Sequence, residues 1–240
     1  MRKKHKEGKS LPEAIAEYSK SKPYFYIEDL KRFLKEKYSQ DSLKKTLYRL
    51  SKNKILYHAG KGWYSKIEKE FVLNLEPVKP IVELLKEKFP LLKFSVWSTE
   101  QIKEYFHHLP TQFLTFIYTD KDFLSSLKDF MEDKGYIVFL NPSKKEIGKY
   151  LSLKENPFIL RSAITYRDSK KNHFKPIEQI LVDLYVESKK INLLDLEEYK
   201  RILGNILLNF RINIAELLDY AHNRKIKPKL KKIVLDVMST

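Results

Sequence analysis

Basic and amide side chains recur between residues 40 and 52 at a spacing that would gather them on one side of a helix. Leu43, Leu47 and Leu50 follow one another at intervals of four and three, which is the spacing of a buried helical face. The positions left over would face solvent and are almost all basic or polar. A helix of this kind fits the major groove of DNA, where arginine can bind guanine, and glutamine adenine, through paired hydrogen bonds. We therefore predict a DNA-reading surface made of Gln40, Ser42, Lys44, Lys45, Tyr48, Arg49 and Lys52.

Further cations flank this segment and would contact the phosphate backbone. Lys31, Arg32 and Lys35 lie in the helical segment that precedes it. Lys54 and Lys61 follow it, the second of them in a predicted hairpin turn. Contacts to phosphates fix the register of a protein on the duplex without reading its sequence.

The elements that would position these residues form a recognisable order within residues 1–66. Ser10 with Glu13 three residues on is the pattern of a helix start, and apolar residues then recur at helical spacing over 11–20, 27–38 and 40–54. Two short strands, 55–58 and 63–65, are joined by the sequence AGKG, whose glycines can supply a positive φ. Three helices followed by a hairpin predict a winged helix-turn-helix.

Charge is concentrated in the same part of the chain. The formal net charge is +16, and residues 1–66 carry 18 Lys or Arg against 7 Asp or Glu, a net of +11. Residues 67–240 carry 29 against 24, a net of +5. This asymmetry favours a polyanion-binding module at the front of the chain. The alternative is that the lysines only keep the protein soluble.

Composition also indicates the cellular compartment in which the protein is expected. The chain has no cysteine, so it forms no disulfide and no thiolate metal site. No apolar run approaches the roughly 20 residues of a membrane helix, and the basic N-terminus lacks the apolar stretch of a secretory signal. We expect a cytoplasmic protein with no membrane partner.

The remainder alternates strands and helices before it becomes helical. Residues 67–80, with prolines at 77 and 80, are predicted to be a linker, and 81–240 a second domain. In it, strands are expected within 91–98, 113–119, 136–143 and 158–166, with helices between them. Helical spacing then dominates 175–188, 195–210, 213–225 and 229–240. The predicted fold class is α+β, with a mixed α/β C-terminal domain that ends in a helical bundle.

One acidic pair could support an enzyme. Asp120 and Asp122 follow a buried strand, where two carboxylates can hold Mg²⁺ for phosphoryl chemistry. The same residues are favoured at the start of a helix, and the chain contains no P-loop or GxGxxG motif. We expect the second interpretation, and hence no catalytic set, no metal and no cofactor. A nucleic-acid-processing enzyme and a protein-interaction module remain the alternatives.

Residues 222–232, HNRKIKPKLKK, form a second basic segment with six Lys or Arg and no acid. It could contact another stretch of nucleic-acid backbone. The simpler interpretation, which we favour from sequence, is a solvated helix end where the helix dipole prefers cations.

Several segments together resemble the AbiEi-type antitoxin and transcriptional-regulator family. They are FSVWSTEQIKEYFHHLPTQFLTFIYTDKDFLSSLKDFMEDKGYIVFLNPS, LRSAITYR, KPIEQILVDLYVE, FRINIAELLDYAHNR and the predicted wing GKGWYS. The likeness extends from about Leu11 to about Arg224. One departure is Lys61, where the family often has arginine before the wing glycine.

The resemblance implies a specific function. Such proteins are encoded beside a nucleotidyltransferase-fold toxin in systems linked to abortive phage infection. Their winged helix represses the promoter of its own operon, and their C-terminal domain carries the antitoxin activity. The resemblance thus implies an operator as the DNA partner, a cognate toxin as the protein partner, and Lys44, Lys45, Tyr48 and Arg49 as operator-reading positions.

Overall fold

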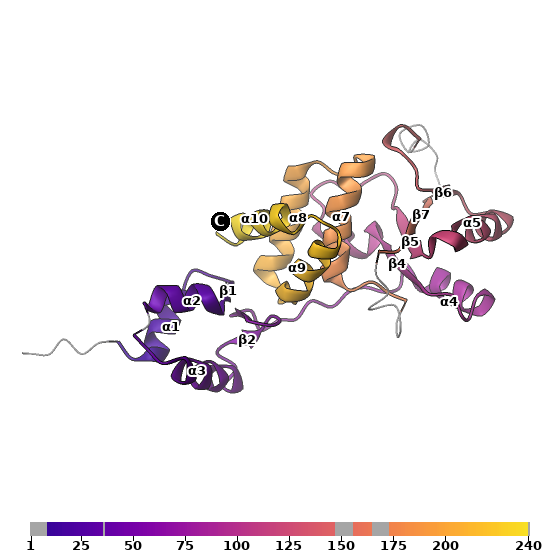
Figure 1. The fold of residues 1–240 in the computed structure, drawn as a ribbon. Helices are drawn as coiled ribbons and strands as arrows, with labels where there is room; N and C mark the ends of the chain where they lie inside the picture. Colours follow the sequence, from indigo (N-terminus) through magenta and orange to yellow (C-terminus); the bar gives the residue numbers. More distant parts are fainter. Residues whose placement is uncertain (1–8, 36, 147–155, 165–172, 240) are drawn as a thin grey trace, which may run out of the picture.

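The computed structural model describes residues 9–35, 37–146, 156–164 and 173–239, arranged as a small N-terminal lobe and a larger C-terminal lobe (Figure 1). We use N-terminal lobe for residues 9–66 and C-terminal lobe for residues 67–239. The smaller lobe contains α1 (Leu11–Ser19), β1 (Tyr24–Tyr26), α2 (Ile27–Leu34), α3 (Gln40–Lys52), β2 (Tyr57–His58) and β3 (Trp63–Ser65).

Local sequence signals set the first helix and the hairpin. Ser10 and Glu13 form a reciprocal cap at the start of α1, in which the Glu13 carboxylate accepts a 2.9 Å hydrogen bond from the Ser10 backbone N–H. Gly60 and Gly62 in the β2–β3 turn have φ of 101° and 76°, values that glycine adopts without a steric cost. Both features confirm the sequence predictions.

The three strands of the N-terminal lobe form one antiparallel sheet in the order β1-β3-β2. The hairpin confirms the sequence prediction, although its first strand starts at Tyr57 and not at Ile55. The lobe has its own core, in which Leu30, Leu43 and Leu47 are buried, whereas Phe33 of α2 is 49% exposed.

The C-terminal lobe is built on a four-stranded sheet in the order β4-β5-β7-β6. Strand β4 is antiparallel to β5, and β5, β7 and β6 are parallel. The elements are α4 (Lys79–Lys88), β4 (Phe94–Ser98), the 3-10 helix η1 (Thr99–Tyr105), β5 (Thr115–Thr119), the 3-10 helix η2 (Lys121–Phe123), α5 (Leu124–Asp133), β6 (Val138–Leu140) and β7 (Phe158–Ser162). Helix α4 begins inside the predicted linker, and residues 165–166 of the strand predicted at 158–166 lie outside the described residues.

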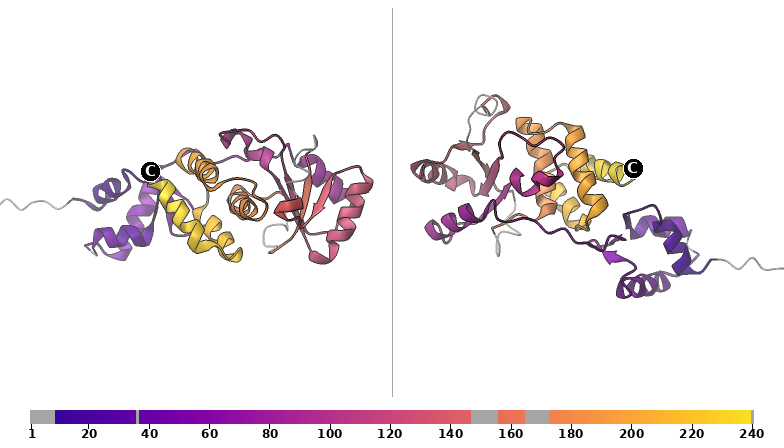
Figure 2. Two further views of the ribbon diagram at one scale, coloured as in Figure 1. Left: turned by 90° about the horizontal axis from the view of Figure 1, so that it is seen from above. Right: turned by 180° about the vertical axis from the view of Figure 1, so that it is seen from behind.

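Helices cover both faces of this sheet (Figure 2). Ile117 and Leu160 point to the face packed by α4 and α5, whereas Phe116, Tyr118 and Ile159 point to the opposite face. Side chains alternate along a strand, so β5 is apolar on both sides, as expected for a central strand.

The opposite face is covered by a bundle of four helices: α7 (Ile177–Ile191), α8 (Leu196–Asn209), α9 (Ile214–Asn223) and α10 (Lys227–Met238). In α7, 12 of 15 residues are buried, so it lies at the centre of the bundle rather than on its surface. The structure therefore confirms an α+β protein with two small sheets and a C-terminal helical bundle. Within the residues described, no helix combines the length and the apolar character needed to cross a membrane.

Candidate nucleic-acid interface

The surface predicted to read DNA lies on α3. The helix begins at a cap in which Ser39 Oγ accepts a hydrogen bond from the backbone N–H of Ser42, at 3.2 Å. Its inner face buries Leu43, Thr46 and Leu47 against the rest of the lobe. The structure places the predicted DNA-reading residues on the outer, exposed side: Gln40, Ser42, Lys44, Lys45, Tyr48, Arg49 and Lys52.

Most cations of this surface are free. Lys44, Lys45 and Lys52 form no ion pair with any residue that the structure describes. Arg49 donates a single 3.3 Å hydrogen bond to the hydroxyl of Thr46, which leaves most of its five donors available. Tyr48 lies on the same side of α3 and is 67% exposed, so its ring is not part of the hydrophobic core. This side of α3 therefore presents positive charge and hydrogen-bond donors to a partner, with Asp41 as the single acid of the helix.

The cations predicted on α2 are close to the start of α3 but are paired. Lys31 lies 2.8 Å from Glu28 and Arg32 lies 3.2 Å from Asp29, each pair within one turn of α2. Exposed pairs of this kind contribute little, so a phosphate can replace the carboxylate at low cost. A hollow of about 890 Å³ between the two helices is lined by Lys31, Arg32 and Gln40 among others. It brings the predicted backbone contacts close to the start of α3.

The β2–β3 hairpin has a second role that the sequence did not predict. Its tip packs against the C-terminal lobe, where the Ile214 backbone N–H donates a 2.9 Å hydrogen bond to Ala59. A methyl group at Gly60 would overlap Asn213 Oδ1 and the side chain of Ala215. Lys61 is exposed at this tip. It therefore lies near the contact between the lobes. The other predicted cations lie on α2 and α3 or, for Lys35 and Lys54, directly after these helices.

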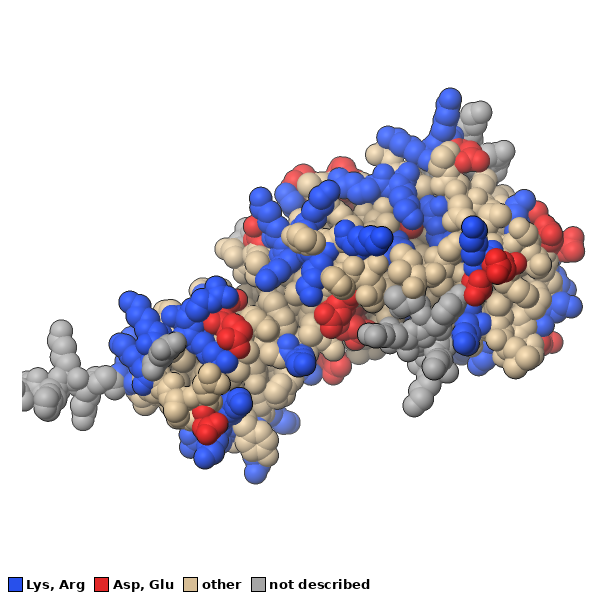
Figure 3. All heavy atoms as spheres, in the orientation of Figure 1, with Lys and Arg blue, Asp and Glu red and all other residues tan. Residues whose placement is uncertain are grey.

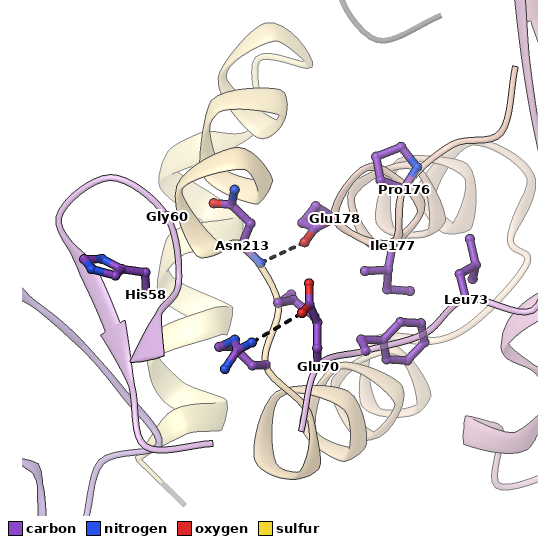
Figure 4. A pocket seen from close by; sticks show the side chains of 11 residues that line it. His58, Gly60, Glu70, Leu73, Pro176, Ile177, Glu178 and Asn213 are labelled. Carbon is purple, nitrogen blue, oxygen red and sulfur yellow. Dashed lines mark hydrogen bonds and ion pairs between the residues drawn. The ribbon is translucent and has the colours of Figure 1, made fainter. Parts of the chain in front are cut away.

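A pocket of about 480 Å³ lies where the hairpin, the segment after it and the bundle meet (Figure 4). Arg211 and Glu70 are paired across it at 3.3 Å, and Glu178 Oε1 accepts a 2.8 Å hydrogen bond from the Asn213 backbone N–H. Burial raises the pKa of the Glu178 carboxyl above its ordinary value, while the hydrogen bonds from backbone N–H groups act in the opposite direction. The pocket thus places one buried carboxyl close to the contact between the lobes.

Sequence analysis also missed a buried charged cluster between the sheet and the bundle, defined by Arg161, Lys175, Asp183, Glu187 and Arg224. Arg161 Nη2 lies 2.6 Å from Glu187 Oε2, and Arg224 Nε lies 3.2 Å from Asp183 Oδ1. Lys175 also binds Asp183. The side chains of Asp183 and Glu187 are 0% exposed. The available signal was that Asp183 and Glu187 stand four residues apart among the apolar residues 180–186 of α7. Acidic residues in such a setting are rarely buried unless they are paired.

Two tyrosines complete the cluster from opposite sides. Tyr220 donates to Asp183 and accepts a 2.9 Å hydrogen bond from Lys175 Nζ, which also lies 3.5 Å from the centre of the Tyr118 ring. Burial lowers the pKa of Lys175, although Asp183 opposes this change. Every member has a partner, so the cluster joins the sheet to the bundle.

The acidic pair that could have supported an enzyme lies at a helix start. Asp120 Oδ1 accepts a 3.3 Å hydrogen bond from the Asp122 backbone N–H at the beginning of η2, which runs on into α5. In the described part of the chain, no three His, Asp or Glu residues gather as a metal site would require.

Fold and surface together define an α+β protein in which a small basic lobe is joined to a larger lobe made of a sheet and a helical bundle. Figure 3 shows lysine and arginine over both lobes. Residues 42–240 match the model of a family of unknown function, DUF6577, and the chain belongs to that family. The match takes in most of α3, the hairpin and the C-terminal lobe. The comparison with curated proteins gave no match.

Proposed function

We propose that this protein binds double-stranded DNA through α3, and that residues 1–66 are a winged helix-turn-helix domain followed by a non-catalytic C-terminal domain. The observation that carries the proposal is the outer side of α3, where unpaired lysines accompany an arginine, a glutamine and a tyrosine on a helix anchored by buried leucines. Cations without partners are the residues expected to replace counterions on a phosphate backbone.

The connectivity of the N-terminal lobe also supports this proposal. Its order is helix, strand, helix, helix, strand, strand, and β1 pairs with β3 rather than with its neighbour in sequence. The hairpin thus shares one sheet with the strand that precedes α2, which supports the proposal of a winged helix. Helix α2 ends at Leu34 and α3 begins at Gln40, so the connection is close in length to that of a helix-turn-helix.

The regulatory role follows from the family resemblance. We propose a repressor of its own operon that also acts as the antitoxin of a nucleotidyltransferase-like toxin in phage defence, located in the cytoplasm. The predicted operator-reading residues Lys44, Lys45, Tyr48 and Arg49 support it, because all four are exposed on one helix. In the C-terminal lobe, the position of Asp120 and Asp122 at a helix start favours a structural rather than a catalytic role.

DNA binding is tested by titrating the full-length protein against duplexes from its own promoter and against scrambled duplexes over a range of salt. Arg49→Ala is expected to cost about 1–3 kcal/mol on the promoter and to relax sequence preference. Lys44→Ala with Lys45→Ala should weaken binding to every duplex and lower the salt slope by about 0.9 per lost contact. Lys86→Ala with Lys121→Ala, two exposed lysines of the other lobe, is the control and should leave α3-dependent specificity unchanged.

The outcomes separate the alternatives. Affinity that does not depend on salt or on α3 would overturn DNA binding and favour a protein-interaction module. The antitoxin role is tested by co-expression with the adjacent reading frame, which should encode the nucleotidyltransferase-like toxin. Growth arrest that this protein does not relieve would overturn that role without affecting the DNA-binding result.

A further inference from the structure

A second group of free cations lies at the junction of α9 and α10. Lys225, Lys229, Lys231 and Lys232 are exposed, and none has an ion-pair partner among the described residues. Lys227 lies 3.7 Å from Asp219, itself 79% exposed. We call these five lysines the α10 patch. Arg224, the sixth cation of the segment, belongs to the buried charged cluster instead.

Most of the α10 patch is solvated and lies at the start of a helix, so the helix dipole, which was the reason given from sequence, does not account for these lysines. A solvated helix end would have placed these lysines at a C-terminus, where the helix dipole stabilises cations. Lys227, Lys229, Lys231 and Lys232 occupy the first half of α10 instead, which has no acidic residue in its first turn and no basic residue in its last, and Lys225 lies between α9 and α10. The exposed N–H groups of the first turn disfavour Lys227 and Lys229, and a bound anion would offset that cost.

Backbone geometry at Lys225 points the same way. Its φ is 58°, in the left-handed region where a Cβ atom is disfavoured and glycine is the usual residue after a helix. Lys35 and Lys54, which precede and follow α3, have φ of 48° and 56°. Lysine therefore occupies a strained position at both borders of the reading helix and at the border of α10. In each case the chain keeps a cation where glycine would fit better.

Figure 1 places α3 in the N-terminal lobe and α10 on the bundle, and in Figure 3 lysine and arginine gather over both of these regions. A duplex that extends beyond the small lobe would therefore meet cations on both lobes. The hydrogen bond between Ala59 and Ile214 joins the two lobes that carry these basic surfaces.

We propose that the α10 patch is a second contact for the phosphate backbone of the same duplex. This inference rests on the proposed DNA binding by α3. The patch carries lysine alone, which binds phosphate as a point charge and lacks the paired donors that arginine uses on guanine. It therefore adds affinity and length to the footprint but reads no sequence.

The test compares two triple variants of the full-length protein that lose the same charge. Lys229→Gln/Lys231→Gln/Lys232→Gln should weaken promoter and scrambled duplexes by the same factor, lower the salt slope by about 0.9 per lost contact, and shorten the protected footprint on one side. Lys86→Gln/Lys121→Gln/Lys134→Gln changes three exposed lysines elsewhere and should leave the slope and the footprint unchanged. A wild-type slope and footprint in the α10 variant would overturn the inference.

A Lys44→Gln/Lys45→Gln variant distinguishes this failure from failure of the proposed function. If it loses DNA while the α10 variant binds like wild type, α3 binding stands and the α10 inference fails. If the α10 variant loses DNA while the α3 variant does not, the proposed binding by α3 fails, and with it the inference that the α10 patch is a second contact on the same duplex.

Lys225→Gly separates binding from folding. Glycine relieves the strained backbone, so the urea midpoint should stay level or rise, while the loss of one cation should weaken binding to every duplex. A variant that is as stable as wild type and binds DNA as tightly would show that the lysine at this position contacts no phosphate.

Discussion

The phenolic oxygen of Tyr24, in the N-terminal lobe, accepts a 3.0 Å hydrogen bond from the backbone N–H of Ile212, in the C-terminal lobe. The same hydroxyl donates to the carbonyl oxygen of Phe210 at 2.6 Å. The side chain of Tyr24 is buried among residues of the bundle rather than in the core of its own lobe. Together with the hairpin contact, this tyrosine fixes how α3 is presented relative to the larger lobe.

Tyr24→Phe removes both hydrogen bonds and changes little else. The Phe210 carbonyl and the Ile212 N–H would remain buried without their partner, so we expect a loss of about 1–3 kcal/mol in the free energy of unfolding. Hydrogen exchange at the Ile212 amide should accelerate. Tyr48→Phe removes an equivalent hydroxyl from an exposed ring and should leave urea unfolding unchanged. Equal stability of the two variants would show that Tyr24 does not join the lobes.

The hairpin contact gives a prediction with an internal control. Gly60 and Gly135 have φ of 101° and 84°, so alanine is strained at both and costs about 1–2 kcal/mol. At Gly135 the new methyl group meets nothing within 4 Å, whereas at Gly60 it overlaps Asn213 and Ala215. Gly60→Ala should therefore lower the free energy of unfolding, measured in urea, by more than Gly135→Ala does, and should loosen the hairpin from α9. Equal losses would mean that the hairpin moves to make room for the methyl group without a cost in stability.

Local signals in the sequence were sufficient to predict the separate elements. The cap at Ser10, the leucine spacing of α3 and the glycines of the hairpin each depend on neighbours within a few residues, and the structure confirms all three. The exposure of the predicted DNA-reading residues follows from the same leucine spacing.

Contacts between distant segments were beyond such reasoning. Nothing local to Tyr24 indicates a partner 188 positions away, and nothing near Arg161 indicates Glu187. The position of the α10 patch could not be predicted for a related reason. From sequence its lysines were placed at the C-terminal end of a helix, whereas the structure ends α9 before Lys225 and puts most of them at the N-terminal end of α10.

Substitutions in the buried charged cluster should destabilise the C-terminal lobe more than substitutions of its surface ion pairs. Glu187→Gln would leave Arg161 buried without a counter-charge, and breaking a buried pair from one side costs about 3–5 kcal/mol. Glu197→Gln is the matched control, because Glu197 is 71% exposed and pairs with Lys200 at 2.8 Å on the surface. That control should cost less than about 1 kcal/mol. Similar urea midpoints for the two variants would show that the cluster contributes no more than a surface pair.

The inter-lobe pocket should make stability depend on pH through Glu178. Burial raises the pKa of its carboxyl in the folded state above the ordinary value of 4.5, so its stabilising contribution is complete below pH 4.5 and is lost as pH rises through the folded pKa. Glu178→Gln keeps an oxygen for the Asn213 N–H but cannot ionise. Between pH 4 and pH 7, the free energy of unfolding of the variant should therefore rise relative to that of wild type. The rise is about 1.4 kcal/mol for each pKa unit by which the folded and unfolded states differ. Urea unfolding at the two pH values measures this gain, with the exposed Glu87→Gln as a control that should show none. A gain of zero for Glu178→Gln would mean that the carboxyl ionises in the pocket as freely as it does in the unfolded chain.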